Sequence, residues 1–223
     1  MKPSSFKDAD RKQESLLAPF EKRILLWLAS KMPTFVNADH LSLLGLVAML
    51  MAGIFYYFSR VEPFYLHLVN LSLALNWFGD SLDGTIARYR NKLRPKYGFY
   101  VDHMIDTFGT LFMIIGLAMS GYMSERIALA ILIVYFMLSI NSYLAAYSIG
   151  TFSISFWKFS PTELRILLAV GNLFLMRNPY STILGKKYLL YDVGGLVGII
   201  GMSLMLLVST IRNTQILYRS ERV

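Results

Sequence analysis

The chain has 223 residues, of which 55% are hydrophobic and 16% are charged, and its formal net charge is +8. Roughly 25% of residues are charged in soluble domains, so this composition excludes an ordinary soluble globular domain. The absence of cysteine excludes disulfides and thiol chemistry, and on a membrane protein the basic balance indicates a cytoplasmic face and anionic lipid rather than nucleic acid.

The N-terminal region divides into a tail and an amphipathic segment. Residues 1–14 are polar and charged, and we expect a loose tail there with no cleavable signal peptide. From 15 to 32 apolar residues recur at helical spacing, which predicts a helix lying in the headgroup plane. The alternative is a soluble amphipathic helix on the surface of a partner. The apolar residues of the segment are Leu16, Leu17, Phe20, Ile24, Trp27 and Leu28.

Long apolar runs dominate the rest of the chain. Five uncharged runs are each near or above the ~17–20 residues that span hydrocarbon, and Pro161 starts a sixth, amphipathic span that ends near Met176. The sequence therefore predicts an all-α integral membrane protein. Six transmembrane helices in residues 38–212 follow the interfacial amphipathic helix and precede a tail at 213–223. The five runs are Leu41–Ser59, Pro63–Gly79, Thr107–Ser124, Ile127–Trp157 and Val193–Ile211.

The first spans carry signals for their boundaries. Asp39 is a plausible N-cap of the first span. The second span continues past Gly79 to about Arg88 and so protrudes beyond the hydrocarbon. A basic link then runs from 89 to 97, and Gly98 precedes the third span. We expect the cations of this link to contact lipid headgroups; they are Arg90, Lys92, Arg94 and Lys96.

The basic residues are distributed unevenly between the two sides of the predicted membrane. Six spans put both termini on one side, and 17 of the 22 Lys and Arg residues fall on that side. The positive-inside rule therefore predicts a multi-pass protein with its termini and the inner ends of its helices in the cytoplasm. The five on the other side are Arg60, Arg126, Arg177, Lys186 and Lys187.

Four of the eight aspartates lie between positions 80 and 106. On helices, positions 80, 83, 84 and 87 share an arc of roughly 100°, and 102 and 106 lie one turn apart. Helices joined by a short link run antiparallel, so one pair of carboxylates can face the other. Carboxylates crowded beside a membrane need neutralising cations. Two divalent ions would neutralise them, and a two-metal carboxylate site is the usual apparatus for displacement at phosphorus. The aspartates are Asp80, Asp83, Asp102 and Asp106.

The pattern Asp80-x-x-Asp83-Gly84-x-x-Ala87-Arg88, then Gly98-x-x-x-Asp102-x-x-x-Asp106, resembles the signature of the CDP-alcohol phosphotransferases. These integral membrane enzymes make phospholipids by moving a phosphoryl-linked group from CDP to an alcohol. Nine residues separate Arg88 from Gly98 where the usual pattern has eight, a difference that a link between helices absorbs. Asp39 stands where the family often has Asn. The resemblance covers nearly the whole chain and implies a homodimer.

The resemblance and the chemistry of carboxylates assign roles within the motif. Mg²⁺ and Mn²⁺ prefer carboxylate oxygen, so Asp80, Asp83 and Asp102 are the expected ligands of two ions. Asp106 is the general base by resemblance and would also help to hold a metal. Small residues on one face of the helix let the nucleotide approach the backbone closely, and Arg88 can pair with the diphosphate. The residues expected to bind CDP are Asp80, Gly84, Ala87, Arg88 and Gly98.

Several polar residues outside the motif have open roles. Lys158 and Arg165 lie on the predicted cytoplasmic side and could receive an acceptor phosphate, with snorkelling and lipid contact as the alternative. We expect His103 to point off the metal face. Intramembrane asparagines are expected to form helix–helix hydrogen bonds rather than to bind substrate; they are Asn70, Asn76, Asn141 and Asn172.

The resemblance implies a choice between two substrate groups. One takes CDP-diacylglycerol with a polar alcohol, and the other takes CDP-choline or CDP-ethanolamine with diacylglycerol. The compact chain is similar to the first group, which we favour, although Asp102-His103 resembles an Asp-His of the second. Two more distant alternatives remain. A membrane prenyltransferase usually has its two aspartate motifs far apart in a longer chain, and a cation transporter places acids near mid-span.

Overall fold

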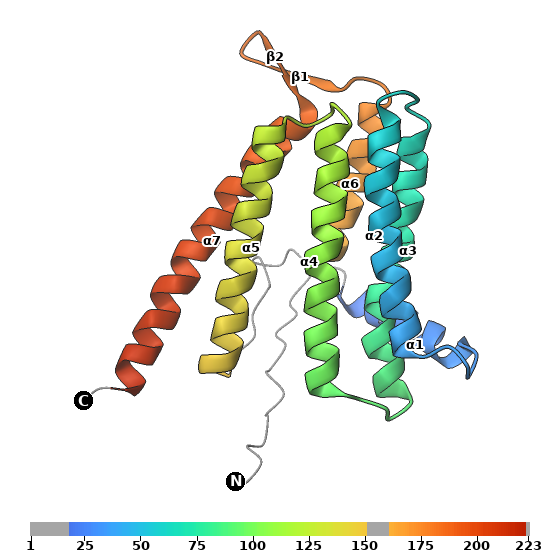
Figure 1. The fold of residues 1–223 in the computed structure, drawn as a ribbon, viewed down its shortest axis with the longest axis vertical. Helices are drawn as coiled ribbons and strands as arrows, with labels where there is room; N and C mark the ends of the chain where they lie inside the picture. Colours follow the sequence, from blue (N-terminus) through green and yellow to red (C-terminus); the bar gives the residue numbers. More distant parts are fainter. Residues whose placement is uncertain (1–17, 151–160, 222–223) are drawn as a thin grey trace.

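Figure 1 shows long helices running side by side, with a short β-hairpin over one end of the bundle and the α3–α4 link at the other. This computed structural model describes residues 18–150 and 161–221. Helices α5 and α7 form a pair that leans away from the remaining helices. The elements are α1 (Ala18–Lys31), α2 (Ala38–Ser59), α3 (Tyr65–Tyr89), α4 (Pro95–Met119), α5 (Glu125–Ser148), α6 (Pro161–Leu175), β1 (Tyr180–Ile183), β2 (Lys186–Leu189) and α7 (Leu190–Ser220).

The described residues are predominantly helical, as the sequence predicts, but some boundaries differ. Helix α4 begins at Pro95 rather than after Gly98, because proline is well suited to the first helical position. Helix α7 continues to Ser220, so most of the predicted tail at 213–223 is helical. The hairpin was not predicted. The N-terminal tail at 1–14 and the link that contains Lys158 lie outside the described residues.

Four of the described helices are long and apolar enough to cross a membrane: α2, α4, α5 and α7. Helix α6 has 15 residues, or about 22 Å at 1.5 Å per residue, which is short of the roughly 30 Å of hydrocarbon in a bilayer. Helix α3 carries charged residues in its last third. Both run alongside the other four (Figure 1), and the count of six spans stays a prediction, as does the interfacial position of α1.

The N-cap of α2 is Asn37, not the predicted Asp39. The Asn37 side chain accepts a hydrogen bond from the His40 backbone N–H at 3.2 Å, and His40 Nδ1 accepts one from the Asn37 N–H at 3.4 Å. This reciprocal arrangement is a capping box. Asp39 lies instead in the first turn, where the helix dipole favours an acidic side chain.

Helix α2 packs against both α3 and α4 and sets the spacing between them. Both contacts are close approaches of backbone at glycine. A methyl group on Gly79 would lie 2.5 Å from the Leu41 carbonyl oxygen, and one on Gly116 would overlap the backbone of Gly53. The two helices that bear the aspartates are therefore held by a common neighbour.

A buried network of polar side chains joins four helices near the hairpin end. The Asn172 side-chain oxygen accepts hydrogen bonds from the hydroxyls of Tyr56 (2.9 Å) and Tyr191 (2.6 Å), and its Nδ2 donates to Asn70 at 2.7 Å. Asn172 is fully buried. The predicted role of the asparagines as helix–helix hydrogen bonders is confirmed here, and the Asn76 Nδ2 likewise donates to the Gly45 carbonyl oxygen at 3.0 Å.

Candidate functional site

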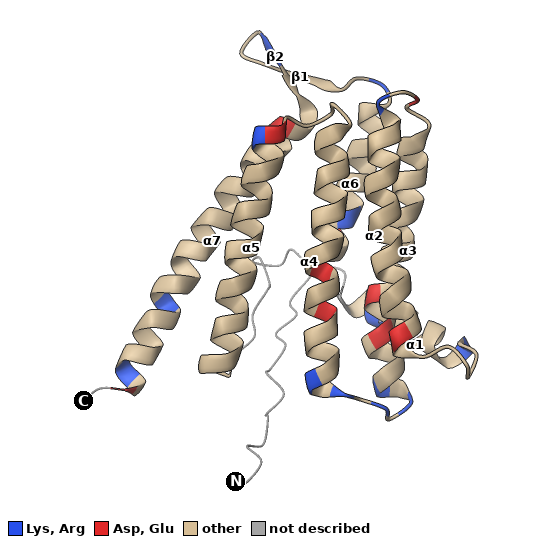
Figure 2. Cartoon of the chain, in the orientation of Figure 1, with Lys and Arg blue, Asp and Glu red and all other residues tan. Residues whose placement is uncertain are grey.

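Acidic residues lie on the neighbouring portions of α3 and α4, away from the hairpin (Figure 2). One carboxylate oxygen from each of Asp80, Asp102 and Asp106 lies within 4.8 Å of the other two, and all three residues are partly buried. Asp80 comes from α3, whereas Asp102 and Asp106 stand one turn apart on α4. We call these three residues the aspartate triad. Three carboxylates this close repel one another unless a cation lies among them.

Asp83, the fourth predicted ligand, lies beside the triad rather than within it. Its Oδ2 accepts a hydrogen bond of 2.5 Å from the Ser42 hydroxyl of α2, and its Oδ1 accepts one from the backbone N–H of Gly84. Ser42 is a site residue that sequence reasoning missed. Its only local signal is its place in the first turns of the helix that follows Asn37.

Arg165, predicted to contact the acceptor, reaches the triad from α6. Its guanidinium lies 2.6 Å from Asp80 Oδ2, and the two side chains are only 15% and 21% exposed. A partly buried pair of this kind interacts more strongly than a surface pair, because water screens it less. The second predicted acceptor residue, Lys158, lies outside the described part of the chain.

His103 packs against aromatic rings beside the triad, and its orientation off the metal face stays a prediction. Its Nδ1 lies 2.6 Å from the carbonyl oxygen of Phe99, and its ring stacks on Phe99 at 4.2 Å and meets Tyr143 edge-on at 4.9 Å. The nearest carboxylate oxygen of Asp102 is 3.7 Å away, beyond hydrogen-bond distance. His103 therefore packs between aromatic rings and helps to orient α4.

The small residues of the motif leave room beside the triad. A methyl group on Gly84 would meet only the guanidinium of Arg88, at 3.6 Å, so Arg88 folds back over this glycine. Gly98 has no atom within 4 Å of where its Cβ would lie, and it is exposed in the first turns of α4. Ala87 is partly buried on α3.

Arg90 and Arg94 of the basic link have partners within the protein, which corrects the expectation that all four cations contact headgroups. Arg90 donates to the carbonyl oxygens of Met32 (2.9 Å), Pro33 (2.8 Å) and Val36, and so ties α3 to the α1–α2 link. Arg94 forms an ion pair with Asp39. These contacts span more than fifty residues of sequence, which is why local pattern did not indicate them.

Glu21 of α1 is the second site residue that the sequence did not reveal. It is buried, with 9% exposure, although it belongs to a helix predicted to lie in the headgroup plane. Its carboxylate accepts hydrogen bonds from Trp77 and Ser81 of α3 and from Thr162 of α6. In the sequence it is one charged residue among several of an amphipathic segment.

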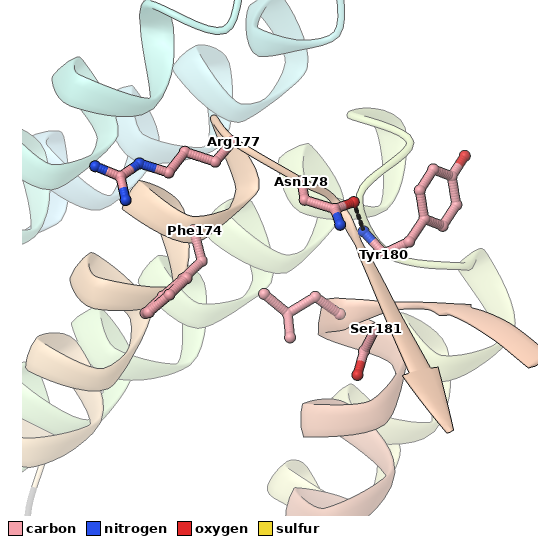
Figure 3. Close-up of a pocket in the computed structure, with 6 residues that line it drawn as sticks. Phe174, Arg177, Asn178, Tyr180 and Ser181 are labelled. Carbon is pink, nitrogen blue, oxygen red and sulfur yellow. Dashed lines mark hydrogen bonds between the residues drawn. The ribbon is translucent and has the colours of Figure 1, made fainter. Parts of the chain in front are cut away.

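A pocket lies at the hairpin end of the bundle, and Figure 3 shows the residues that line it. Phe174 and Leu190 line it, and the Asn178 side chain accepts a hydrogen bond from the Tyr180 backbone N–H at 3.0 Å. The guanidinium of Arg177 points away from Asn178 and Tyr180. The pocket thus shares no residue with the acidic site.

The donor set of the triad fits a hard divalent cation. All three side chains offer carboxylate oxygen, which is the ligand type that Mg²⁺ and Mn²⁺ prefer. Their partial burial lets them remain in reach of a water-soluble ligand while still being held by two long helices.

Comparison with known proteins agrees with this geometry. The family model of the CDP-alcohol phosphatidyltransferases matches residues 35–209, a span that includes all of α2 to α6 and the triad. No curated protein matches the chain by sequence. The matched span covers more than half of the chain, and the chain therefore belongs to the CDP-alcohol phosphatidyltransferase family, whose members transfer a phosphoryl-linked group from a CDP-alcohol.

Proposed function

We propose that the protein transfers a phosphatidyl group from CDP-diacylglycerol to the hydroxyl of a polar alcohol and releases CMP. The observation that carries the proposal is the convergence of Asp80, Asp102 and Asp106 from two helices to within 4.8 Å. Carboxylates in this arrangement suit a reaction in which the charge of a diphosphate must be neutralised. Family membership supports a CDP-alcohol as the donor.

We assign two divalent ions, Mg²⁺ or Mn²⁺, to the carboxylates of this site. The triad would hold one ion, and Asp83, one turn from Asp80 on the same face of α3, would contribute to the second. When bound, the ions neutralise the diphosphate and make its phosphorus more electrophilic. Ser42 orients Asp83 through their 2.5 Å hydrogen bond.

The donor nucleotide would lie over the small residues of α3. Gly84 and Ala87 have little or no side chain to obstruct that face, and the Arg88 guanidinium lies next to Gly84. A guanidinium binds phosphate oxygens through two parallel hydrogen bonds. Gly98 lies in open space at the start of α4 and admits the same ligand.

In the chemical step Asp106 takes the proton from the acceptor hydroxyl. The acceptor oxygen then forms a bond to the phosphorus that carries the diacylglycerol, and the bond from that phosphorus to the bridging oxygen of CMP breaks. The proton remains on Asp106 until solvent removes it, and CMP leaves with the electron pair of the broken bond.

Arg165 favours an anionic acceptor over diacylglycerol. Its guanidinium lies at the triad, where a phosphorylated polar alcohol would give it a partner and neutral diacylglycerol would not. Lys158 would assist from the α5–α6 link. The amino-alcohol alternative loses its main support, because His103 is packed between Phe99 and Tyr143. The acids lie between the middle of α4 and the α3–α4 link (Figure 2), so the cation-path alternative is tested directly by the vesicle measurement below.

Activity measurements on purified protein test the proposal. CMP release is expected from CDP-diacylglycerol with a phosphorylated polyol and Mg²⁺ or Mn²⁺, and exhaustive chelation is expected to abolish it. Release from CDP-choline or CDP-ethanolamine with diacylglycerol would establish the alternative. Metal uptake by sealed vesicles without CMP release would indicate a transporter. The site would face the cytoplasm, and the chain would form a homodimer.

A further inference from the structure

Glu21 links three helices at the triad end of the molecule. A single oxygen of its carboxylate accepts hydrogen bonds from Trp77 Nε1 (2.7 Å), Thr162 Oγ1 (2.8 Å) and Ser81 Oγ (3.3 Å). No lysine or arginine of the described residues forms an ion pair with it. A buried carboxylate depends on such donors for its stability, so these hydrogen bonds constrain the positions of the helices that supply them.

The partners of Glu21 flank two residues of the site. Trp77 and Ser81 stand three residues before and one residue after Asp80 on α3. Thr162 stands three residues before Arg165 on α6, close to one helical turn. The Asp80–Arg165 ion pair therefore joins the same two helices that Glu21 holds from the side of α1.

Helix α1 is seated by apolar packing as well as by this carboxylate. Leu25 and Ala29 are buried in a cluster with Leu41 and Leu82, while Phe20 and Trp27 are mostly exposed on the outer side. The hydrogen bonds of Glu21 and the apolar contacts of Leu25 come from different side chains of α1. A single substitution can therefore remove either set of contacts.

We propose that Glu21 is a positioning residue, which fixes the ends of α3 and α6 relative to each other and so holds Asp80 and Arg165 in place for ligand binding. The inference rests on the proposed function of the triad. Glu21 lies before residues 35–209, the span that the family model matches, so it adds a part of the site that belongs to the N-terminal segment.

Three variants separate positioning from general stability. Glu21→Ala removes the acceptor, Glu21→Gln keeps an oxygen in the same place, and Leu25→Ala loosens the apolar seat of α1 only. Mn²⁺ affinity is measured by electron paramagnetic resonance without substrate. Loss of a residue that orients a ligand typically costs 10–100-fold, so we expect Glu21→Ala to weaken Mn²⁺ binding about tenfold. In Glu21→Gln and Leu25→Ala the Mn²⁺ affinity should stay within about threefold of that of the unmodified protein, because both variants leave Asp80 oriented as a metal ligand.

A second measurement needs neither metal nor substrate. Because the chain has no cysteine, spin labels at Tyr89→Cys on α3 and Leu164→Cys on α6 report the distance between these helices by pulsed resonance. We expect a broadened distance distribution in Glu21→Ala and the original one in Glu21→Gln and Leu25→Ala. Unchanged distances and Mn²⁺ affinity in Glu21→Ala, or equal changes in Leu25→Ala, would overturn the proposal. Failure of the unmodified protein to release CMP would instead count against the proposed function, because the distance measurement does not depend on it.

Discussion

At the scale of single residues, Asp80 is paired with one cation and is proposed to bind a second. The guanidinium of Arg165 lies 2.6 Å from its Oδ2, while the proposed divalent ion would use the same carboxylate. A metal that binds to Asp80 must therefore displace Arg165 or share the carboxylate with it. Displacement would free the guanidinium to bind the acceptor. Metal binding would then increase the affinity of the site for an anionic acceptor.

Replacement of Arg165 by Gln is predicted to change metal and acceptor binding in opposite directions. Loss of a competing cation should tighten Mn²⁺ binding in the absence of substrate, by severalfold. The KM for an anionic acceptor should rise by about tenfold or more, because a charge-assisted hydrogen bond contributes roughly 1.5–3 kcal/mol. Titration of Mn²⁺ and steady-state kinetics measure the two effects. Weaker Mn²⁺ binding in Arg165→Gln would show that the guanidinium supports the metal site.

Asp106 is predicted to differ in role from Asp83. A base acts on the acceptor hydroxyl during transfer, whereas a metal ligand also holds the donor. Asp106→Asn should lose nearly all turnover and still bind a CDP-alcohol with metal, though more weakly, and Asp83→Asn should lose donor binding as well. Calorimetry of donor binding, set beside rates of CMP release, distinguishes them. Equal loss of donor binding in both variants would reduce Asp106 to a further ligand.

The sequence predicted which aspartates share a helix face, because their spacing is local. Positions 102 and 106 follow the period of one helix, and so do 80 and 83. The partners Ser42 and Glu21 could not be predicted this way, because 41 residues separate Ser42 from Asp83 and 56 separate Glu21 from Trp77. Only the packing of α1 and α2 against α3 brings them together.

At the scale of elements, the helices are held by polar contacts as well as by apolar packing. Asn172 of α6 accepts from Tyr56 of α2 and Tyr191 of α7 and donates to Asn70 of α3. Asn172→Leu would remove the acceptor of the Tyr56 hydroxyl and the donor to the Asn70 side-chain oxygen, whereas the Tyr191 hydroxyl keeps the Leu168 carbonyl oxygen at 2.9 Å. Each unsatisfied group costs about 1–3 kcal/mol. We expect a clearly lower unfolding temperature in detergent, with little change in Mn²⁺ affinity because the network is far from the triad.

Asn141 provides a matched control for this substitution. It donates one hydrogen bond of 2.9 Å to Ser209 of α7 and accepts one of 3.4 Å from Thr210, both partners lying on the same helix. Asn141→Leu should therefore lower the unfolding temperature less than Asn172→Leu. An equal effect of the two substitutions would show that the four-helix network adds nothing beyond one helix–helix contact.

The long apolar helices were predictable because uncharged runs of that length occur almost only in helices that span a membrane. The hairpin was not predictable from the sequence. Its strands have four residues each, and its turn places Leu184 at φ 49° and Gly185 at φ 79°. Turns with two positive φ angles normally carry Asn-Gly or Asp-Gly. Here leucine occupies the first turn position, so the Asn-Gly or Asp-Gly pair that identifies such a hairpin is absent from the sequence.

At the scale of the whole molecule, charge and architecture favour one orientation in the membrane. The α3–α4 link and the triad lie toward one end of the bundle and the hairpin lies at the other (Figures 1 and 2). In the predicted six-span arrangement, 17 of the 22 basic residues fall on the side of the link. From the positive-inside rule we predict that the link and the triad face the cytoplasm and that the hairpin faces the opposite side.

Two single-cysteine variants test this orientation in intact cells. Lys92→Cys places a thiol in the exposed link between α3 and α4, and Lys186→Cys places one at the exposed start of β2. The chain has no cysteine of its own, so no background labelling arises from it. A membrane-impermeant maleimide should label Lys186→Cys from outside and Lys92→Cys only after permeabilisation. The opposite pattern would place the triad outside, where cytoplasmic CDP-diacylglycerol could not reach it, and would contradict both the topology and the proposed substrate.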